Sequence, residues 1–190
     1  MNTPAHLAIN LVLLGRKETP KHQAVILFGA LLPDLVMFFF YFFEKVINRH
    51  SEIDIWSKLY YTPFWQNWFD LFNSIPLIIL GVLICYWQKW KIAILFFLSM
   101  LLHVAGDIFL HNDDGHRHFF PFSEFRLESP VSYWDPKHYG AIVFPIEIIL
   151  VFVSVFILYR SAQYTMSRWI TSLILATYLF FIVYVFIVWV

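Results

Sequence analysis

The residues best suited to chemistry lie in the segment 103–118, at the end of an apolar run. They are His103, Asp107, His111, Asp113, Asp114, His116 and His118. Imidazole and carboxylate groups are the ligands that divalent zinc, manganese and iron prefer. Ionisable groups inside a membrane are costly and are usually kept for function. The segment therefore predicts a metal site at the mouth of a membrane helix.

Helical geometry sharpens this prediction. His103, Asp107 and His111 are spaced four residues apart, so on a helix they share one face. Two of them can grip one metal ion. The alternative is a buried hydrogen-bonded pair, His103 with Asp107, that only ties helices together. The further histidines of the segment favour a metal, and we predict zinc, with manganese and iron as alternatives.

The composition predicts an integral membrane protein. Of the 190 residues, 60% are hydrophobic, 21% are aromatic and only 14% are charged. The formal net charge is zero, so we expect no nucleic-acid partner. The single cysteine, Cys85, excludes an internal disulfide and a cysteine-based zinc site. No basic residue precedes the N-terminal apolar part, so we expect no cleaved signal peptide.

Five apolar stretches approach the length of about 20 residues that a spanning helix needs. They cover residues 24–43, 68–87, 92–110, 141–159 and 169–189. A shorter segment, 5–14, predicts a tilted or half-inserted N-terminal helix. The expected fold is an all-α, polytopic membrane helical bundle with five spanning helices plus one short N-terminal helix. It forms a single membrane-embedded domain, 1–190, with a functional loop at about 112–140.

Basic residues predict the orientation of this bundle. The short connections carry Arg16, Lys17, Lys21, Lys89, Lys91, Arg160 and Arg168. Short basic connections stay on the cytoplasmic side of a membrane. The long connections, 44–67 and 112–140, are then outside, together with the metal site. We predict a protein of the bacterial inner (plasma) membrane whose site faces outside.

Other polar residues fall in the same half of the predicted bundle. They are His6, Asp34, Asp70, Asn73 and Glu147. Asp34 follows a helix-kinking proline and is expected to be a metal ligand or a general base. Asp70 and Glu147 are possible linings of the site. Packing is the alternative for both, as is a salt bridge from Glu147 to Arg126.

The loop adds possible substrate contacts. Arg126 can bind a phosphate or a carboxylate through two parallel hydrogen bonds. A surface salt bridge with Glu124 or Glu128 is the alternative. His138 is either a further ligand or an interfacial residue, and the loop's aromatic side chains can lie among lipid head groups.

The order of these motifs resembles a known family. The motifs are Pro-x-His at Pro4 and His6, GALLPD at 29–34, HxxxD at His103 and Asp107, and PFS at 121–123 followed by Arg126. This order resembles the LexA-binding, inner-membrane-associated metal-dependent hydrolases. That family is similar in turn to the zinc-dependent phospholipase C and single-strand nuclease superfamily, whose helical enzymes bind a cluster of metals through His and Asp. The resemblance covers roughly the first 140 residues.

The resemblance implies roles for particular residues. The implied metal ligands are His6, Asp34, His103 and Asp107, with Ser123 and Arg126 near the substrate. Many relatives have His-Ser where this chain has Asn73 and Ser74. The metal ligand expected at this position is therefore weakened, or it is supplied instead by Asp70. The 111–118 run contains more His and Asp than the family pattern. It therefore offers replacement ligands from the loop: His111 and His118, with His116 as a further candidate. The number of metals, from one to three, stays open.

The predicted function is that of a membrane-embedded metal-dependent hydrolase. A bound metal lowers the pKa of a water molecule and polarises the scissile bond. Asp34, or the Asp113 and Asp114 pair, would accept the water proton as a catalytic base. The expected substrate is a phosphoester of a membrane lipid or lipid-linked molecule at the outer membrane–water interface. The sequence specifies neither the head group nor the oligomeric state.

Two other classes of function remain open. One is a proton- or metal-ion transporter that uses the same intramembrane His and Asp residues, although these residues occupy only one half of the membrane. The other is a non-enzymatic metal- or haem-binding scaffold, although several carboxylates favour a hard-ligand metal over haem. No HExxH motif occurs, so a zincin-type protease is not supported.

Overall fold

The computed structural model of the protein describes residues 1–188, which are 73% helical and contain no strand. The helices are α1 (Thr3–Asn10), α2 (Pro20–Phe42), α3 (Glu52–Asp54), α4 (Pro63–Phe72), α5 (Ile75–Trp87), α6 (Lys91–Asp107), α7 (Gly140–Ser161) and α8 (Thr165–Val188). The predicted helical class is confirmed. The predicted short N-terminal helix is α1 followed by a π-helical turn, Leu11–Gly15.

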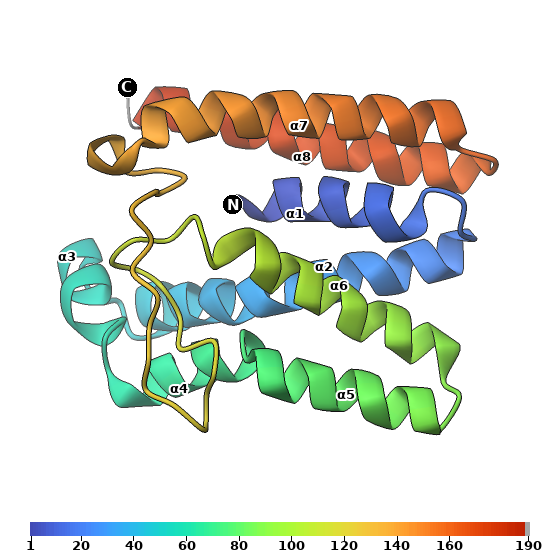
Figure 1. Ribbon diagram of the computed structural model, residues 1–190. Coiled ribbons are helices and arrows are strands. Elements are labelled where there is room, and N and C mark those ends of the chain that lie inside the picture. Colours follow the sequence, from blue (N-terminus) through green and yellow to red (C-terminus); the bar gives the residue numbers. More distant parts are fainter. Residues whose placement is uncertain (189–190) are drawn as a thin grey trace.

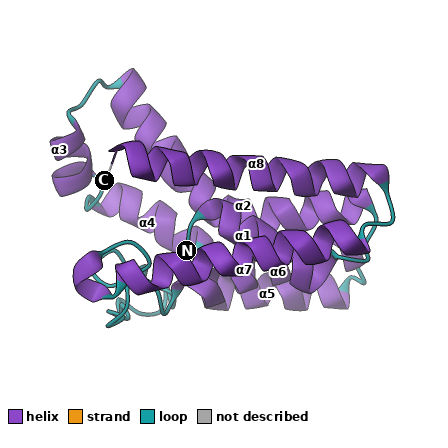
Figure 2. Ribbon diagram, turned by 90° about the horizontal axis from the view of Figure 1, so that it is seen from above, coloured by secondary structure: helices purple, strands orange, loops and turns teal. Residues whose placement is uncertain are grey.

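The helices are arranged in layers around α1 (Figure 1). The α7–α8 hairpin covers one side of α1, α2 and α6 pack against the other side, and α5 lies beyond α6. Seen from above, α7 and α8 lie over α1 (Figure 2). Ala5 and Ala8 of α1 and Leu11 of the π-helical turn are buried in a core cluster with Val151 of α7 and Tyr178 of α8. The short helix α1 is therefore enclosed within the bundle.

A glycine allows α2 and α6 to cross closely. A Cβ atom at Gly29 would lie 2.3 Å from the backbone oxygen of Phe96, so a larger residue would push the two helices apart. At the same crossing, Ser99 Oγ donates a 2.6 Å hydrogen bond to the carbonyl of Ile26. This crossing brings the next turns of α2, with Asp34, beside His103 of α6.

Three helical segments are long and apolar enough to span a membrane: Pro20–Ile47, Gly140–Ser161 and Thr165–Ile187. The predicted span 68–87 is not one straight helix, because α4 and α5 meet at a 41° bend. They form a fourth candidate only when taken together. The predicted span 92–110 ends early, at Asp107. The end of the predicted span 169–189 lies outside the described residues.

The length of α6 explains why the predicted span 92–110 is not among the confirmed ones. Its 17 residues correspond to about 26 Å at 1.5 Å per residue, which is less than the about 30 Å thickness of a bilayer core. Three candidate spans nevertheless agree with a membrane protein. The early end of α6 also has a consequence for the site, because it turns the chain into the loop directly after Asp107.

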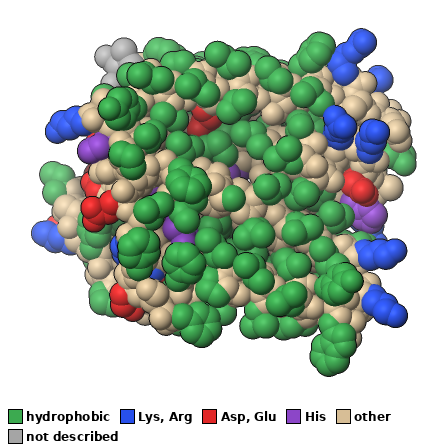
Figure 3. Space-filling view, in the orientation of Figure 1, with side chains coloured by type: hydrophobic (Ala, Val, Ile, Leu, Met, Phe, Trp, Pro, Cys, Tyr) green, Lys and Arg blue, Asp and Glu red, His purple; other side chains and the backbone are tan. Residues whose placement is uncertain are grey.

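Charged side chains gather mainly at the two ends of the bundle (Figure 3). Hydrophobic side chains cover the face between these ends, and side chains such as Leu83, Phe156 and Phe180 are exposed. The three short basic connections, α1–α2, α5–α6 and α7–α8, lie together at one end (Figure 1). The long connections lie at the opposite end. An apolar belt between two polar ends is the surface that a bilayer requires.

Candidate metal centre

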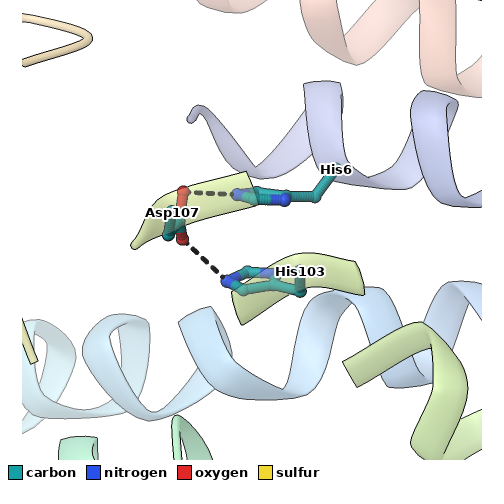
Figure 4. Close-up of side chains that lie close together, drawn as sticks. All are labelled: His6, His103 and Asp107. Carbon is teal, nitrogen blue, oxygen red and sulfur yellow. Dashed lines mark hydrogen bonds and ion pairs between the residues drawn. The ribbon is translucent and has the colours of Figure 1, made fainter. Parts of the chain in front are cut away.

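Three of the predicted ligands converge where α1 passes the C-terminal end of α6 (Figure 4). His6 Nε2 lies 2.9 Å from Asp107 Oδ1, and His103 Nε2 lies 3.1 Å from Asp107 Oδ2. The two imidazole rings are stacked with their centroids 3.7 Å apart. One ligand atom from each residue lies within 4.8 Å of the other two, and all three residues are buried. The amine of Met1 also contacts Asp107 Oδ1.

Asp34 lies at the edge of this cluster. Its Oδ1 atom is 3.5 Å from His103 Nε2, and its Oδ2 atom accepts a 2.5 Å hydrogen bond from Thr3 Oγ1. The side chain of Asp34 is 26% exposed, whereas that of His103 is 1% exposed. The cluster therefore reaches the surface of the protein at Asp34.

The backbone of α2 orients His103. The Nδ1 atom lies 2.7 Å from the carbonyl oxygen of Ala30, and since a carbonyl can only accept, Nδ1 carries the proton. In the neutral imidazole, Nε2 then holds the free lone pair. A second partner of this kind fixes the tautomer of most metal-binding histidines. Asn10 supports the same helix crossing, because its Nδ2 donates a 2.7 Å hydrogen bond to the carbonyl of Ser99.

The donor set fits a divalent metal. His103 Nε2 is buried, lies near two carboxylates, and yet has no hydrogen-bond partner of acceptable geometry. Leaving such an atom unpaired costs about 1–3 kcal/mol. The donor–donor distances within the cluster, 2.9, 3.1 and 3.5 Å, lie close to the about 3.3 Å that separates ligands around a tetrahedral zinc with bonds of about 2.0 Å.

A second group of ligand-type atoms adjoins the first. His111 Nε2 lies 3.6 Å from Asp107 Oδ1, and His111 Nδ1 lies 3.0 Å from Asp114 Oδ2. The ring of His116 has its centroid 6.1 Å from that of His111. Three buried atoms of this group have no hydrogen-bond partner: His111 Nδ1, Asp114 Oδ1 and His116 Nδ1. This group has the chemistry of a second ligand set that shares Asp107 with the first.

The two loop histidines differ in protonation. Burial opposes the charged form of His111, but the adjacent carboxylates of Asp107 and Asp114 outweigh burial and raise its pKa to about 9. At pH 7 His111 is therefore protonated, and it would have to release that proton to bind a metal. Burial lowers the pKa of His116 to about 4, and the charges of His111 and His118 act in the same direction. At pH 7 His116 is therefore neutral, which is the form that a metal ligand requires.

Asp70 anchors the loop to α4 instead of joining the cluster. It accepts hydrogen bonds from the backbone N of Arg117, at 2.8 Å, and from its Nε, at 2.5 Å. Arg117 also donates to Asn67 Oδ1 at 2.6 Å and contacts Glu124. His116 Nδ1 lies 3.8 Å from Asp70. Arg117 is not among the residues predicted from the sequence, where its only signal is its position between two candidate ligands.

The loop also fills the break between α4 and α5. The backbone N of Ile75 donates to the carbonyl of His118 at 2.9 Å, and His118 Nδ1 lies 3.2 Å from the carbonyl oxygen of Asn73. Ser74 Oγ donates to the carbonyl of Phe120 at 2.5 Å. These contacts pair backbone groups that the break would leave free. Asn73 Nδ2 donates a 3.0 Å hydrogen bond to the carbonyl of Phe69, whereas Asn73 Oδ1 is buried and has no hydrogen-bond partner.

The predicted substrate residues have structural partners. Arg126 donates to the carbonyl of Gly115 at 2.6 Å and to Gln66 Oε1 at 2.8 Å, so it bridges the loop to α4 without pairing with Glu124 or Glu128. Ser123 Oγ accepts a hydrogen bond from the backbone N of Phe125. Among residues 1–188, Asp113 is exposed and forms no side-chain hydrogen bond or ion pair.

Two further candidates lie apart from the cluster. His138 pairs with Asp135, Nδ1 to Oδ2, at 2.7 Å. Glu147 accepts hydrogen bonds from Asn2 and Tyr178 and does not contact Arg126. In contrast, Tyr133, which its sequence context assigns to the lipid interface, lies against His111 with ring centroids 5.1 Å apart. Burial and nearby carboxylates raise the pKa of Tyr133, so its phenol stays protonated beside the site.

Comparisons of the chain with protein-family models, with curated proteins and with solved structures found no match. A function for this protein therefore has to be argued from the site itself.

Proposed function

We propose that the protein is a metal-dependent hydrolase of the bacterial inner membrane. Its substrate would be a phosphoester of a lipid or lipid-linked molecule at the outer face. The observation that carries the proposal is the convergence of His6, His103 and Asp107, in which the buried Nε2 of His103 faces carboxylates without forming a hydrogen bond of acceptable geometry. The motif resemblance to the LexA-binding, inner-membrane-associated hydrolases agrees with this assignment.

His6, His103 and Asp107 would hold the metal, with Asp34 at the edge as a further ligand or as the base, and with His111, Asp114 and His116 as the second ligand set. A bound zinc, manganese or iron ion would supply a water molecule of lowered pKa and would polarise the phosphoryl oxygen. Asp34 is the ligand-type residue best placed to accept the proton of an incoming water, because its carboxylate reaches the surface. Asp113 lacks contacts with the cluster, and Asp114 is engaged by His111 and by Trp134 Nε1.

An apolar groove supports a lipid substrate. Its volume is about 440 Å³, and its walls are Pro76, Leu77, Leu80 and Leu83 of α5 together with Phe122 of the loop. A groove of this composition within the apolar belt suits an acyl chain. Phe122 belongs to the same loop that carries His116 and His118, so a lipid held in the groove would place its head group beside the loop.

In the membrane, we propose five crossings: α2, the bent α4–α5 pair, α6, α7 and α8. The basic connections would lie in the cytoplasm and the metal centre outside. A cysteine introduced at exposed Lys137, in a Cys85→Ala background, should react with a membrane-impermeant thiol reagent on intact spheroplasts. The matched variant Lys89→Cys, at the opposite end, should react only after lysis. The reverse pattern would place the site in the cytoplasm.

The contacts disfavour the two alternatives. A transporter needs a continuous polar path through the basic end of the bundle. There the buried polar side chains Asn10, Gln23 and Ser99 are engaged by backbone carbonyls, and Ala8, Leu11, Ile26 and Leu158 form an apolar core. A haem held by a pair of histidines needs their nitrogens on opposite sides of its plane, whereas the rings of His6 and His103 are stacked directly on each other.

The function is tested with the full-length protein purified in detergent and loaded with zinc or manganese. We expect it to release phosphate or a phosphorylated head group from phospholipids or lipid-linked phosphates, with the activity removed by chelator and restored by metal. The same preparation in sealed proteoliposomes should show no proton or zinc flux. Flux without hydrolysis would mean that the protein is a transporter and not a hydrolase.

A further inference from the structure

The α7–α8 hairpin contributes no ligand to the metal centre, yet it holds one buried carboxyl group against α1. We propose that Glu147 of α7 is a positioning residue that sets the place of His6. This inference rests on the proposed metal centre and assigns to Glu147 a role other than that of a ligand.

The contacts of Glu147 are specific. Its Oε2 atom accepts a 3.1 Å hydrogen bond from the backbone N of Asn2. Its Oε1 atom accepts hydrogen bonds from Asn2 Nδ2, at 2.7 Å, and from the hydroxyl of Tyr178, at 3.1 Å. All three residues are buried. A carboxylate only accepts hydrogen bonds, and here three donors from two other helical segments converge on it.

The connection from Asn2 to His6 is direct. Asn2 is the N-cap residue of α1, and its carbonyl oxygen accepts hydrogen bonds from the backbone N of Ala5, at 2.8 Å, and of His6, at 3.2 Å. Glu147 therefore holds Asn2 in place, and Asn2 in turn holds the first turn of α1. On the other side, a Cβ at Gly106 would lie 3.3 Å from His6 Cε1, so the ring is already close to α6. A shift of α1 would carry His6 away from Asp107.

The surroundings show why a polar contact matters here. Apart from this contact, α1 meets the hairpin through apolar side chains such as Ala5, Ala8 and Val151. Apolar packing fixes the distance between helices, but it leaves sliding and rotation cheaper than a hydrogen bond does. A buried carboxyl group is costly unless it is paired. The Glu147 contact fixes the register of α1 against the hairpin, as the hydrogen bonds of Thr3 and Asn10 fix it against α2 and α6.

The test is a double-mutant cycle on zinc affinity, measured by chelator competition with the full-length protein in detergent. Glu147→Gln keeps the size of the side chain but places an amide NH₂ where Asn2 or Tyr178 donates. We expect zinc binding about 10-fold weaker, the range found for lost supporting partners of metal ligands. In a His6→Ala background, Glu147→Gln should change zinc affinity no further. Effects that multiply in the double variant would overturn the proposal.

A matched control separates positioning from packing. Val151 lies one helical turn from Glu147 on the same interface, so Val151→Ala should lower the unfolding temperature of the metal-free protein while leaving zinc affinity within about twofold of wild type. A comparable loss of affinity in Val151→Ala would mean that Glu147 acts only through packing.

A metal-free readout distinguishes failure of this inference from failure of the metal centre. The ring ¹⁵N resonances of His6, assigned by their loss in His6→Ala, should shift in Glu147→Gln, while those of His138 should stay in place. If the wild-type protein binds no zinc, the metal centre is wrong, and the resonances of His6 still decide the positioning role. Unchanged His6 resonances in Glu147→Gln would refute that role.

Discussion

Replacing both His103 and Asp107 by alanine is expected to remove most of the bound metal while the protein still inserts into the membrane. The substitution deletes one imidazole and the carboxylate that contacts His6, His103 and His111. Loss of a supporting partner alone weakens metal binding by about 10–100-fold, so loss of two ligands should exceed about 100-fold. Elemental analysis of the purified protein measures the change.

The same variant should also lose the stabilisation that metal provides. Wild-type protein with free metal at about 100 times its dissociation constant should gain about 2.7 kcal/mol in the free energy of unfolding. The variant should unfold at the same temperature with and without chelator. The matched control is the double variant His138→Ala and Asp135→Ala, which removes a His–Asp pair outside the cluster and should retain the metal. Equal metal content in wild type and in the variant that lacks His103 and Asp107 would contradict the proposed metal centre.

Asp34→Asn is expected to lower turnover by about 10²–10⁴-fold, the usual contribution of a general base. The substitution keeps the shape of the side chain and the hydrogen bond from Thr3, but it removes the negative charge that faces His103 at 3.5 Å. Hydrolysis of the best phospholipid or lipid-linked phosphate found for wild type is the measurement, made at saturating metal.

Asp113→Asn is the control for Asp34→Asn. Asp113 carries the same carboxylate, but it is exposed and stands apart from the cluster. We expect the turnover of the Asp113→Asn variant to stay within about twofold of wild type, because substitutions of isolated surface residues rarely have large effects. A large loss in Asp113→Asn together with a normal rate in Asp34→Asn would move the base from α2 to the loop.

Much of the helical architecture could be predicted from the sequence, because apolar length and the positions of charge are local properties. The exceptions have physical causes. The span expected at 68–87 is bent where the loop contacts it: the carbonyl of Asn73 and the backbone N of Ile75 bond to His118, and the hydroxyl of Ser74 bonds to Phe120. The span expected at 92–110 ends at Asp107, where the chain turns so that His111 folds back toward the same carboxylate.

The contacts of the candidate site also fall into two groups: those that follow from local spacing and those that depend on the tertiary fold. The pairing of His103 with Asp107 follows from their spacing of four residues on one helix. The approach of His6 and Asp34 depends on the enclosure of α1 and on the close crossing at Gly29, which no local pattern encodes. Asp70 meets Arg117 across 47 positions of sequence, and Glu147 meets Asn2 across 145. Partners this distant in sequence are visible only in the folded chain.

The most direct test of the metal centre is X-ray absorption at the zinc edge on wild-type protein purified without added chelator. The account predicts at least one zinc per chain, bound by nitrogen and oxygen at about 2.0–2.1 Å with the outer scattering of imidazole. Metal at well below one ion per chain, even after incubation with zinc, would contradict it. So would a spectrum dominated by sulfur ligands at about 2.3 Å.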